Sequence, residues 1–342
     1  MRHTLMFFLI GGILVPHVNA LQKDSRTYEH ETPDKGGMLV LVSDQEQEAS
    51  SDVDPEVPPR VVGQGTQEEL DALDVVENLQ DPVQQIAEGH VFLETYPESG
   101  LTAYVHYVLS TAYRRQNDIE SFLKHGEEAL KELPDLPQVL AYQAFFNSER
   151  RQPLKARRAA VRALGILEDM VKPDYLSARE WASQKMSLVA EAKYALGRVY
   201  LSEAVRKKLA GAEDPTLKTS VGHFLDSIAA NPEHQFSTYR LAEAYQRQKD
   251  YEASMKAYAR SVAMGGPIGQ MARERLEMIY KAVRKTKSAS PANLMVSEQN
   301  SQIAADKAAK EAALDQIQVE ADAAAAEAVS EIDEGVLEEV FP

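Results

Sequence analysis

The sequence predicts an all-α protein whose central region is a stack of antiparallel helix pairs, with an acidic segment on either side of it. Three observations lead to this prediction. Apolar residues recur at helical spacing from about Gln80 onward, prolines divide that region, and two segments far apart in the chain repeat one another. No run of alternating apolar and polar residues lies between turn residues, so we expect no β-sheet.

Proline-containing breaks set the expected ends of the helices. Proline ends or starts a helix because it has no N–H group and because its ring collides with the preceding turn. The intervals between the breaks suit helices of roughly 12 to 20 residues, an ordinary length in globular proteins. The breaks fall at Tyr96-Pro97, Leu133-Pro134, Lys172-Pro173, Asp214-Pro215, Asn231-Pro232 and Gly265-Gly266-Pro267.

One helix is expected to be longer than the others. Ser177 and Glu180 have the spacing of a capping box, in which each side chain accepts a hydrogen bond from the backbone N–H of the other residue. A helix is therefore predicted to begin at Ala178 and to run unusually far. Trp181, the only tryptophan in the chain, follows directly. We expect it to pack at a helix junction rather than to bind a ligand.

The most specific signal is an internal repeat. Residues 113–119 (YRRQNDI) match residues 245–251 (YQRQKDY), and residues 196–200 (LGRVY) give a third copy of the first helix. The step from Tyr200 to Tyr245 is 45 residues, of which an insertion around residues 210–215 accounts for 11. The remaining period is 34 residues.

These residues resemble the tetratricopeptide repeat, a family with that period. The resemblance implies a right-handed superhelical stack of antiparallel helix pairs over residues 79–286, with about four units and flanking helices. It also implies that Asp118 and Asp250 cap second helices. Phe122 and Gly126 depart from the usual pattern, and the usual tryptophan is absent. The pattern is visible in Leu109, Tyr113, Ala129 and Pro134 of the first unit, and in Leu196, Gly197, Tyr200, Phe224 and Pro232 of the third.

The segments outside residues 79–286 are interpreted from composition. Residues 1–20 have the features of a signal peptide, with an apolar run and small residues that predict cleavage after Ala20. An uncleaved membrane anchor is the alternative, although the run is shorter than a membrane span. Residues 21–78 are expected to be a disordered acidic linker. Residues 287–342 are expected to be a disordered, acidic, low-complexity tail rich in Ala and Glu, with the propensity for a frayed, solvated helix and a weak coiled-coil pattern.

Charge and composition exclude several kinds of function. The chain has 37 basic and 53 acidic residues, and most of its net charge of −16 lies in the two ends. This balance argues against nucleic acid as a partner. The chain has no cysteine, which excludes disulfides, thiol catalysis and cysteine-based metal sites. No catalytic or phosphate-binding motif occurs, and the eight histidines are scattered, so we expect no enzyme activity, no cofactor and no metal.

The resemblance places a partner-binding groove on the first helix of each pair. Tyrosine and arginine are enriched at interface hot spots, so their recurrence there suggests that an extended peptide or a partner helix binds in the groove. The alternative is that several of the tyrosines pack between helices. The predicted residues are Tyr104, Tyr107, Arg114, Arg115, Phe145, Tyr194, Arg198, Phe236, Tyr239 and Arg247, with Thr111, Gln138, Ala141, Glu191 and Glu243 beside them.

A second candidate surface is a cluster of basic residues: Arg150, Arg151, Lys155, Arg157, Arg158 and Arg162. It suits an acidic partner, an anionic envelope surface or the protein's own acidic ends. The alternative is that it is an ordinary solvated helix face.

The sequence therefore predicts an exported bacterial protein, periplasmic or secreted, that binds a protein or peptide partner without catalysis. The alternative is a structural spacer in an envelope assembly or trafficking complex. An enzyme built on helical repeats would need convergent polar groups in one pocket, and the sequence offers no such set. The partner and the oligomeric state stay open.

Overall fold

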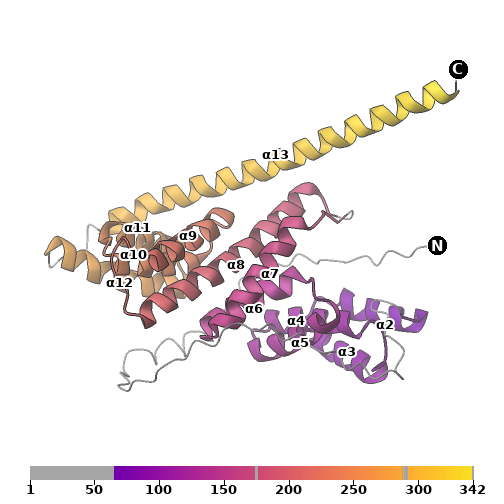
Figure 1. Ribbon diagram of the computed structural model, residues 1–342, viewed down its shortest axis with the longest axis horizontal. Helices are drawn as coiled ribbons and strands as arrows, with labels where there is room; N and C mark the ends of the chain where they lie inside the picture. Colours follow the sequence, from indigo (N-terminus) through magenta and orange to yellow (C-terminus); the bar gives the residue numbers. More distant parts are fainter. Residues whose placement is uncertain (1–64, 174–175, 287, 289–291, 341–342) are drawn as a thin grey trace. The chain divides into compact units, whose positions relative to one another are not determined.

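The computed structural model describes residues 65–173, 176–286, 288 and 292–340 (Figure 1). Within these ranges every regular element is an α-helix, and no strand occurs. The all-α prediction is confirmed. The described chain divides between Leu133 and Pro134 into two compact units, where the sequence had suggested one domain over residues 79–286. Pro134 lies in the connection and Pro137 is the first residue of the next helix, and both prevent a helix from continuing through this point.

The described residues of unit 1, 65–133, form four helices, each packed on the next. They are α2 (Gln67–Asn78), α3 (Pro82–Thr95), α4 (Thr102–Arg115) and α5 (Ile119–Glu132). Its core contains Phe92, Leu109 and Phe122, all at most 2% exposed. Asp118 caps α5 by accepting from the backbone N–H of Ser121 at 3.1 Å, as the repeat pattern implies.

Helix α2 corrects one expectation. It lies inside the segment 21–78 that composition assigned to a disordered linker, and that assignment is wrong for residues 67–78. Thr66 and Glu69 form a capping box, and Leu73 and Val76 are buried. The high acidic content suggested solvation, but one apolar face is enough to dock a short helix. Residues 1–64, with the predicted signal peptide and the rest of the linker, lie outside the described residues.

In unit 2, the part of the chain that the structure describes forms eight helices. They are α6 (Pro137–Glu149), α7 (Pro153–Asp169), α8 (Ala178–Arg206), α9 (Pro215–Ala230), α10 (Gln235–Gln248), α11 (Tyr251–Met264), α12 (Gly266–Arg284) and α13 (Ala292–Val340). Each packs on the next in the chain, and α6, α8, α10 and α12 also pack on one another in that order. These four helices form one layer, and α7, α9 and α11, each packed on two successive members of it, form the other.

Small residues bring the paired helices together. A Cβ atom at Gly197 of α8 would lie 2.7 Å from the ring of Phe224 in α9, so only glycine fits there. Ser220 and Ser227 of α9 donate hydrogen bonds to backbone carbonyls of α8, at 2.9 and 2.7 Å. The predicted breaks between helices are confirmed, as is the start of the 29-residue helix α8 at Ala178 behind its capping box. Trp181 is 8% exposed within this unit.

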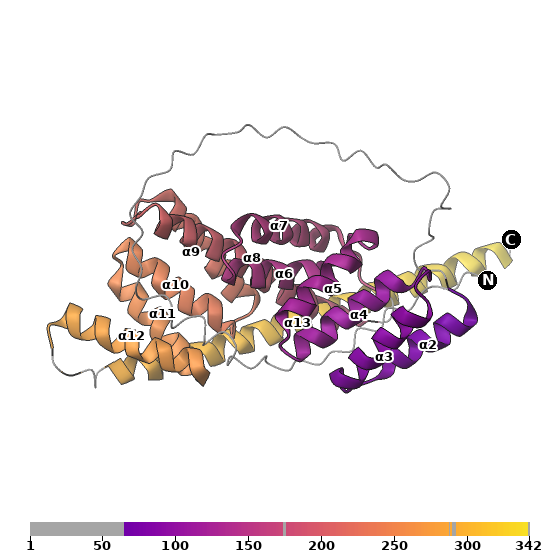
Figure 2. The same ribbon diagram turned by 90° about the horizontal axis from the view of Figure 1, so that it is seen from below.

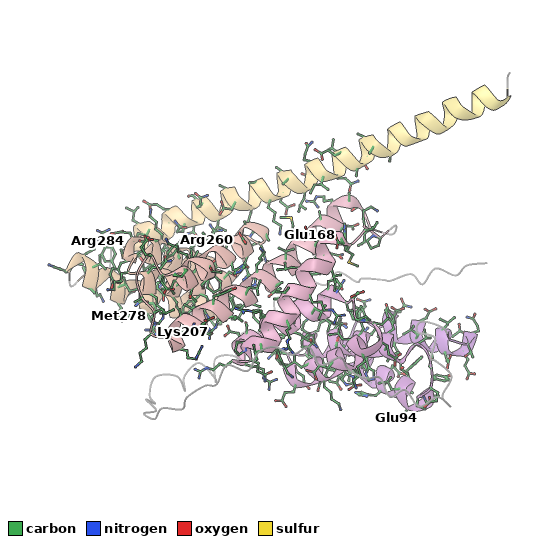
Figure 3. All side chains as sticks on the ribbon, in the orientation of Figure 1. Glu94, Glu168, Lys207, Arg260, Met278 and Arg284 are labelled. Carbon is green, nitrogen blue, oxygen red and sulfur yellow. The ribbon has the colours of Figure 1, made fainter. Side chains whose placement is uncertain are left out.

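Helix α13 differs from the frayed, solvated helix that composition suggested. It is continuous over 49 residues and packs on α8, α11 and α12 (Figure 1). Leu314 is only 2% exposed, and Arg260 of α11 pairs with Asp306 at 2.5 Å. Figure 3 shows Arg260 beside this helix. Arg179 of α8 pairs with Asp315 at 2.9 Å and with Glu311. Ion pairs and one buried leucine therefore dock a helix whose apolar residues are sparse.

None of the described helices combines the length and the apolar character that crossing a membrane requires.

Candidate partner-binding site

The layer formed by α6, α8, α10 and α12 carries a row of polar and aromatic side chains. On α10, Phe236, Arg240, Glu243 and Arg247 follow one another at spacings of four, three and four residues. This spacing places them on one face of the helix. Glu149 lies at the end of α6, and Tyr194 and Arg198 lie one turn apart on α8. We call this surface the α10 face.

Glu149 is the centre of the α10 face. Its Oε1 accepts hydrogen bonds from the Tyr194 hydroxyl at 2.5 Å and from Arg198 Nε at 2.9 Å. Its Oε2 accepts from Arg240 Nη2 at 2.9 Å, and Arg240 Nη1 donates to Glu243 at the same distance. One carboxylate therefore joins α6, α8 and α10. The three hydrogen bonds that Glu149 accepts hold the three helices in register.

Arg198 and Arg240 keep the Glu149 carboxylate ionised. Burial by itself would raise the pKa of Glu149, but Arg240 and Arg198, with the hydrogen bonds from Tyr194 and Arg240, lower it to about 2. Burial and the adjacent Glu149 raise the pKa of Tyr194 well above its usual value. Near neutral pH the network therefore consists of one carboxylate, two guanidinium groups and a neutral phenol.

An aromatic cluster lies directly beside the charges. The ring of Phe145 is 5.1 Å from the rings of both Tyr194 and Phe236, and Tyr194 is 5.3 Å from His234. His234 Nε2 lies 3.3 Å from a carboxylate oxygen of Glu191. These rings shield the ion pairs on one side, which strengthens the electrostatic interactions within the network.

The edge of the α10 face is accessible. Glu243 is 32% exposed at its side chain, Arg247 is half-buried, and Arg275 of α12 is exposed. Arg275 hydrogen-bonds Tyr239, and Met278 of α12 is 49% exposed. Accessible cations beside an aromatic side chain form the kind of surface that a peptide can bind.

The buried arginines retain binding capacity. Arg198 uses Nε for Glu149 and Nη1 for Ser202, at 2.9 and 2.7 Å, and a guanidinium group has five N–H donors. Its side chain is 16% exposed, and that of Arg240 is 21% exposed. The site can therefore accept a carboxylate or a backbone carbonyl from a partner. Among the described residues, no group of three or more histidine, aspartate or glutamate side chains is placed to hold a metal ion.

The structure separates the predicted groove residues into two sets. Tyr104, Tyr107, Phe145, Tyr194 and Tyr239 are between 0% and 9% exposed. These side chains fill the interior, as the alternative interpretation of the tyrosines held. Burial in this conformation leaves them little surface to offer a partner.

The remaining predicted residues keep some surface. Arg198, Phe236 and Arg247 belong to the α10 face of unit 2. Arg114 and Arg115 lie in unit 1, where Arg115 donates to the backbone carbonyl of Gln80 at 3.1 Å and to the Gln85 side chain. That these residues contact a partner stays a prediction.

The basic cluster is exposed along α7 and the turn before it. Arg162 lies 3.6 Å from Asp135, and the Arg157 guanidinium lies 5.0 Å from the centre of the Tyr200 ring. The cluster consists of Arg150, Arg151, Lys155, Arg157, Arg158 and Arg162, all exposed. It is separate from the α10 face, because α7 belongs to the other layer of unit 2.

Sequence reasoning missed several residues of the α10 face. Glu149 and Arg240 are 91 positions apart, and nothing local marks them as partners. It also missed that His90, His106 and His125 of unit 1 lie together, with His106 Nδ1 2.9 Å from His125 Nδ1. These three histidines lie on α3, α4 and α5, which are consecutive helices of the chain. That order was the one signal in the sequence that they could meet.

Comparisons with known proteins give limited information. No family model matches the chain, and no curated protein matches it significantly. Among solved structures, the chain is similar to PilW, described as a widely conserved type IV pilus biogenesis factor, with 14% identity and a TM-score of 0.39. The match covers 68% of this chain and all of PilW. It is also similar to PilF of Pseudomonas aeruginosa, with 15% identity, a TM-score of 0.39, and coverage of 69% and 100%. Similarity at this level does not identify a function.

Proposed function

We propose that this protein is a non-enzymatic interaction scaffold that works outside the cytoplasm and binds a peptide segment of a partner protein on the α10 face. The observation that carries the proposal is the network around Glu149. It fixes two arginines on neighbouring helices before any partner arrives, so binding does not have to order them. Arg247, Arg275 and Phe236 provide the accessible edge of the same surface.

The chemistry of the α10 face favours an extended or helical peptide that brings acidic or carbonyl groups to the arginines and an apolar side chain to Phe236. Arginine beside aromatic residues is typical of interface hot spots. The positive and negative groups alternate across the surface, from Glu149 through Arg240 to Glu243, so the partner must match a charge pattern. Such matching sets specificity and register more than affinity.

The test is capture of the partner from envelope extract by the full chain and by two variants of equal charge change. R247E/R275E reverses two accessible charges of the α10 face, and R158E/R162E reverses two on α7. A partner retained by wild type and R158E/R162E but lost by R247E/R275E supports the proposal. Equal retention by both variants would move the site away from the α10 face. Trp181 fluorescence controls for folding, since this tryptophan is buried in unit 2.

A structural spacer is the second candidate. It is favoured by apolar side chains exposed on the opposite layer, where Leu154 and Val161 of α7 are 72% and 58% exposed. Exposed apolar side chains that gather on one surface often mark a contact with another macromolecule. In that case R158E/R162E, and not R247E/R275E, would release the neighbouring component.

A further inference from the structure

The outer face of α7 combines exposed cations with exposed apolar side chains. Helix α7 packs into unit 2 through Ala156, Ala160 and Ala163, which are fully buried. Its other side presents Leu154 and Val161, with Arg158 in the turn between them. No acidic residue occurs from residue 150 to residue 167. We call this surface, with the basic cluster defined above, the α7 basic face.

The same chain contains a segment of opposite charge. Residues 319–340 hold eight acidic and no basic residues, and they form the last part of helix α13. Every hydrogen bond and ion pair that joins α13 to the rest of unit 2 comes from Gln318 or an earlier residue, among the described side chains. Val319 is 61% exposed, and residues 322–325 are exposed as well. The described side chains of this acidic segment, those of residues 319–325, therefore lie past the hydrogen bonds and ion pairs that dock α13.

The acidic helix cannot reach the α7 basic face of its own chain without breaking. Helix α13 is continuous to Val340 and packs on α8, α11 and α12, but it makes no contact with α7. Figure 2 shows α7 and α13 on opposite sides of α6 and α8. A second copy of the chain has no such restriction.

We propose that the α7 basic face binds the acidic helix 319–340 of a second copy of this protein. The helix is about 33 Å long at 1.5 Å per residue, enough to run along the whole of α7. Its sequence has apolar residues at 329, 332 and 336, the period of one helix face, which suits the exposed Leu154 and Val161. The opposite charges of the two helices draw them together and select their orientation.

This association is head to tail, because each copy supplies one basic face and one acidic helix. A contact of this type closes into a two-fold dimer when two copies exchange their helices, and otherwise builds larger rings or open chains. The inference concerns the layer opposite the α10 face, so it goes beyond the function proposed above and does not depend on it.

The test measures self-association of the full chain by sedimentation over a range of concentrations, at low and high salt. Wild type should associate at low salt and dissociate as salt screens the charges. A chain that ends at Gln318 keeps every described hydrogen bond and ion pair between α13 and the other helices, and it should stay monomeric. R158E/R162E should raise the dissociation constant at least tenfold. The control K281E/R284E, with the same charge change on α12, should leave it unchanged; Figure 3 shows Arg284 at the end of that helix.

A mixing experiment separates head-to-tail binding from other modes. The chain that ends at Gln318 has a basic face and no acidic helix, while R158E/R162E has the reverse. Neither should associate alone, but their mixture should form heterodimers and stop there, because no further face or helix is free. R158A/R162A, which retains helix propensity, repeats the test if the glutamate variant is less stable.

Three results would overturn the inference. They are a wild type that stays monomeric at low salt, a truncated chain that associates as strongly as wild type, and a mixture that forms no heterodimer. Monomeric wild type that instead binds vesicles of anionic lipid through Arg158 and Arg162 would assign the α7 basic face to a membrane surface.

Discussion

Replacing Glu149 with glutamine should destabilise unit 2 by roughly 3 kcal/mol. Glutamine retains the size of the side chain but removes the charge that Arg198 and Arg240 share. The pKa of Glu149 lies at about 2 instead of the usual 4.5, so the folded protein prefers the ionised carboxylate over a neutral one. That preference corresponds to roughly 3 kcal/mol. Removing one partner from other buried ion pairs costs about 3 to 5 kcal/mol, which agrees.

The assay is urea unfolding followed by Trp181, which reports on unit 2 alone because it is the only tryptophan in the chain. E243Q is the matched control, since Glu243 pairs with the same Arg240 but is 32% exposed. It should cost less than about 1 kcal/mol. The free energy of unfolding should also fall for wild type as the pH drops from about 4.5 towards 2, and this fall should be smaller in E149Q. A loss below about 1 kcal/mol in E149Q would refute the reasoning, because the two arginines would then not need their counter-charge.

Three further predictions concern packing and pH. The pKa of His125 is lowered to about 4, first by burial and then by His106 and His90. The stability of unit 1 should therefore be complete above pH 6.5 and fall by up to about 3 kcal/mol as the pH falls towards 4. Hydrogen exchange of unit 1 should show this pH dependence in wild type, and the dependence should be weaker in H125Q. G197A should lower the free energy of unfolding by about 1 to 3 kcal/mol, because the added methyl group overpacks against the buried ring of Phe224. Alanine at the exposed Gly222 should instead stabilise α9 by about 0.5 to 1 kcal/mol. Unfolding detected by Trp181 fluorescence measures both. L314A should weaken the docking of α13 on the other helices by about 2 to 3 kcal/mol, because Leu314 is buried. Hydrogen exchange should then be faster over residues 292–318 and unchanged in α8.

Local signals predicted the helices well where they were present. Each proline break marks a helix boundary, because proline acts on the backbone of its own turn. The capping box at Ser177 located the start of α8. An equivalent capping box, Thr66 with Glu69, was present before α2, but the acidic composition of the segment outweighed it. Composition is a weaker guide than a cap, because it does not say whether one face is apolar.

Long-range features could not be predicted from one sequence. The docking of α13 depends on Arg260 and Arg179, which lie 46 and 136 positions before their partners Asp306 and Asp315. The repeat pattern indicated which helix face carries Tyr194 and Tyr239. It could not say whether those rings point between helices or outward, because that depends on the space that Phe145 and Phe236 leave between helices.

The most direct test of the α10 face as the partner-binding site is photo-cross-linking in intact cells. A photoreactive amino acid at position 247 lies at the accessible edge of the surface, and the same residue at position 281 of α12 serves as the control. The account predicts a discrete adduct from position 247 that disappears when R275E is introduced, and no such adduct from position 281. An adduct from 281 alone, or one from 247 that survives R275E unchanged, would contradict it.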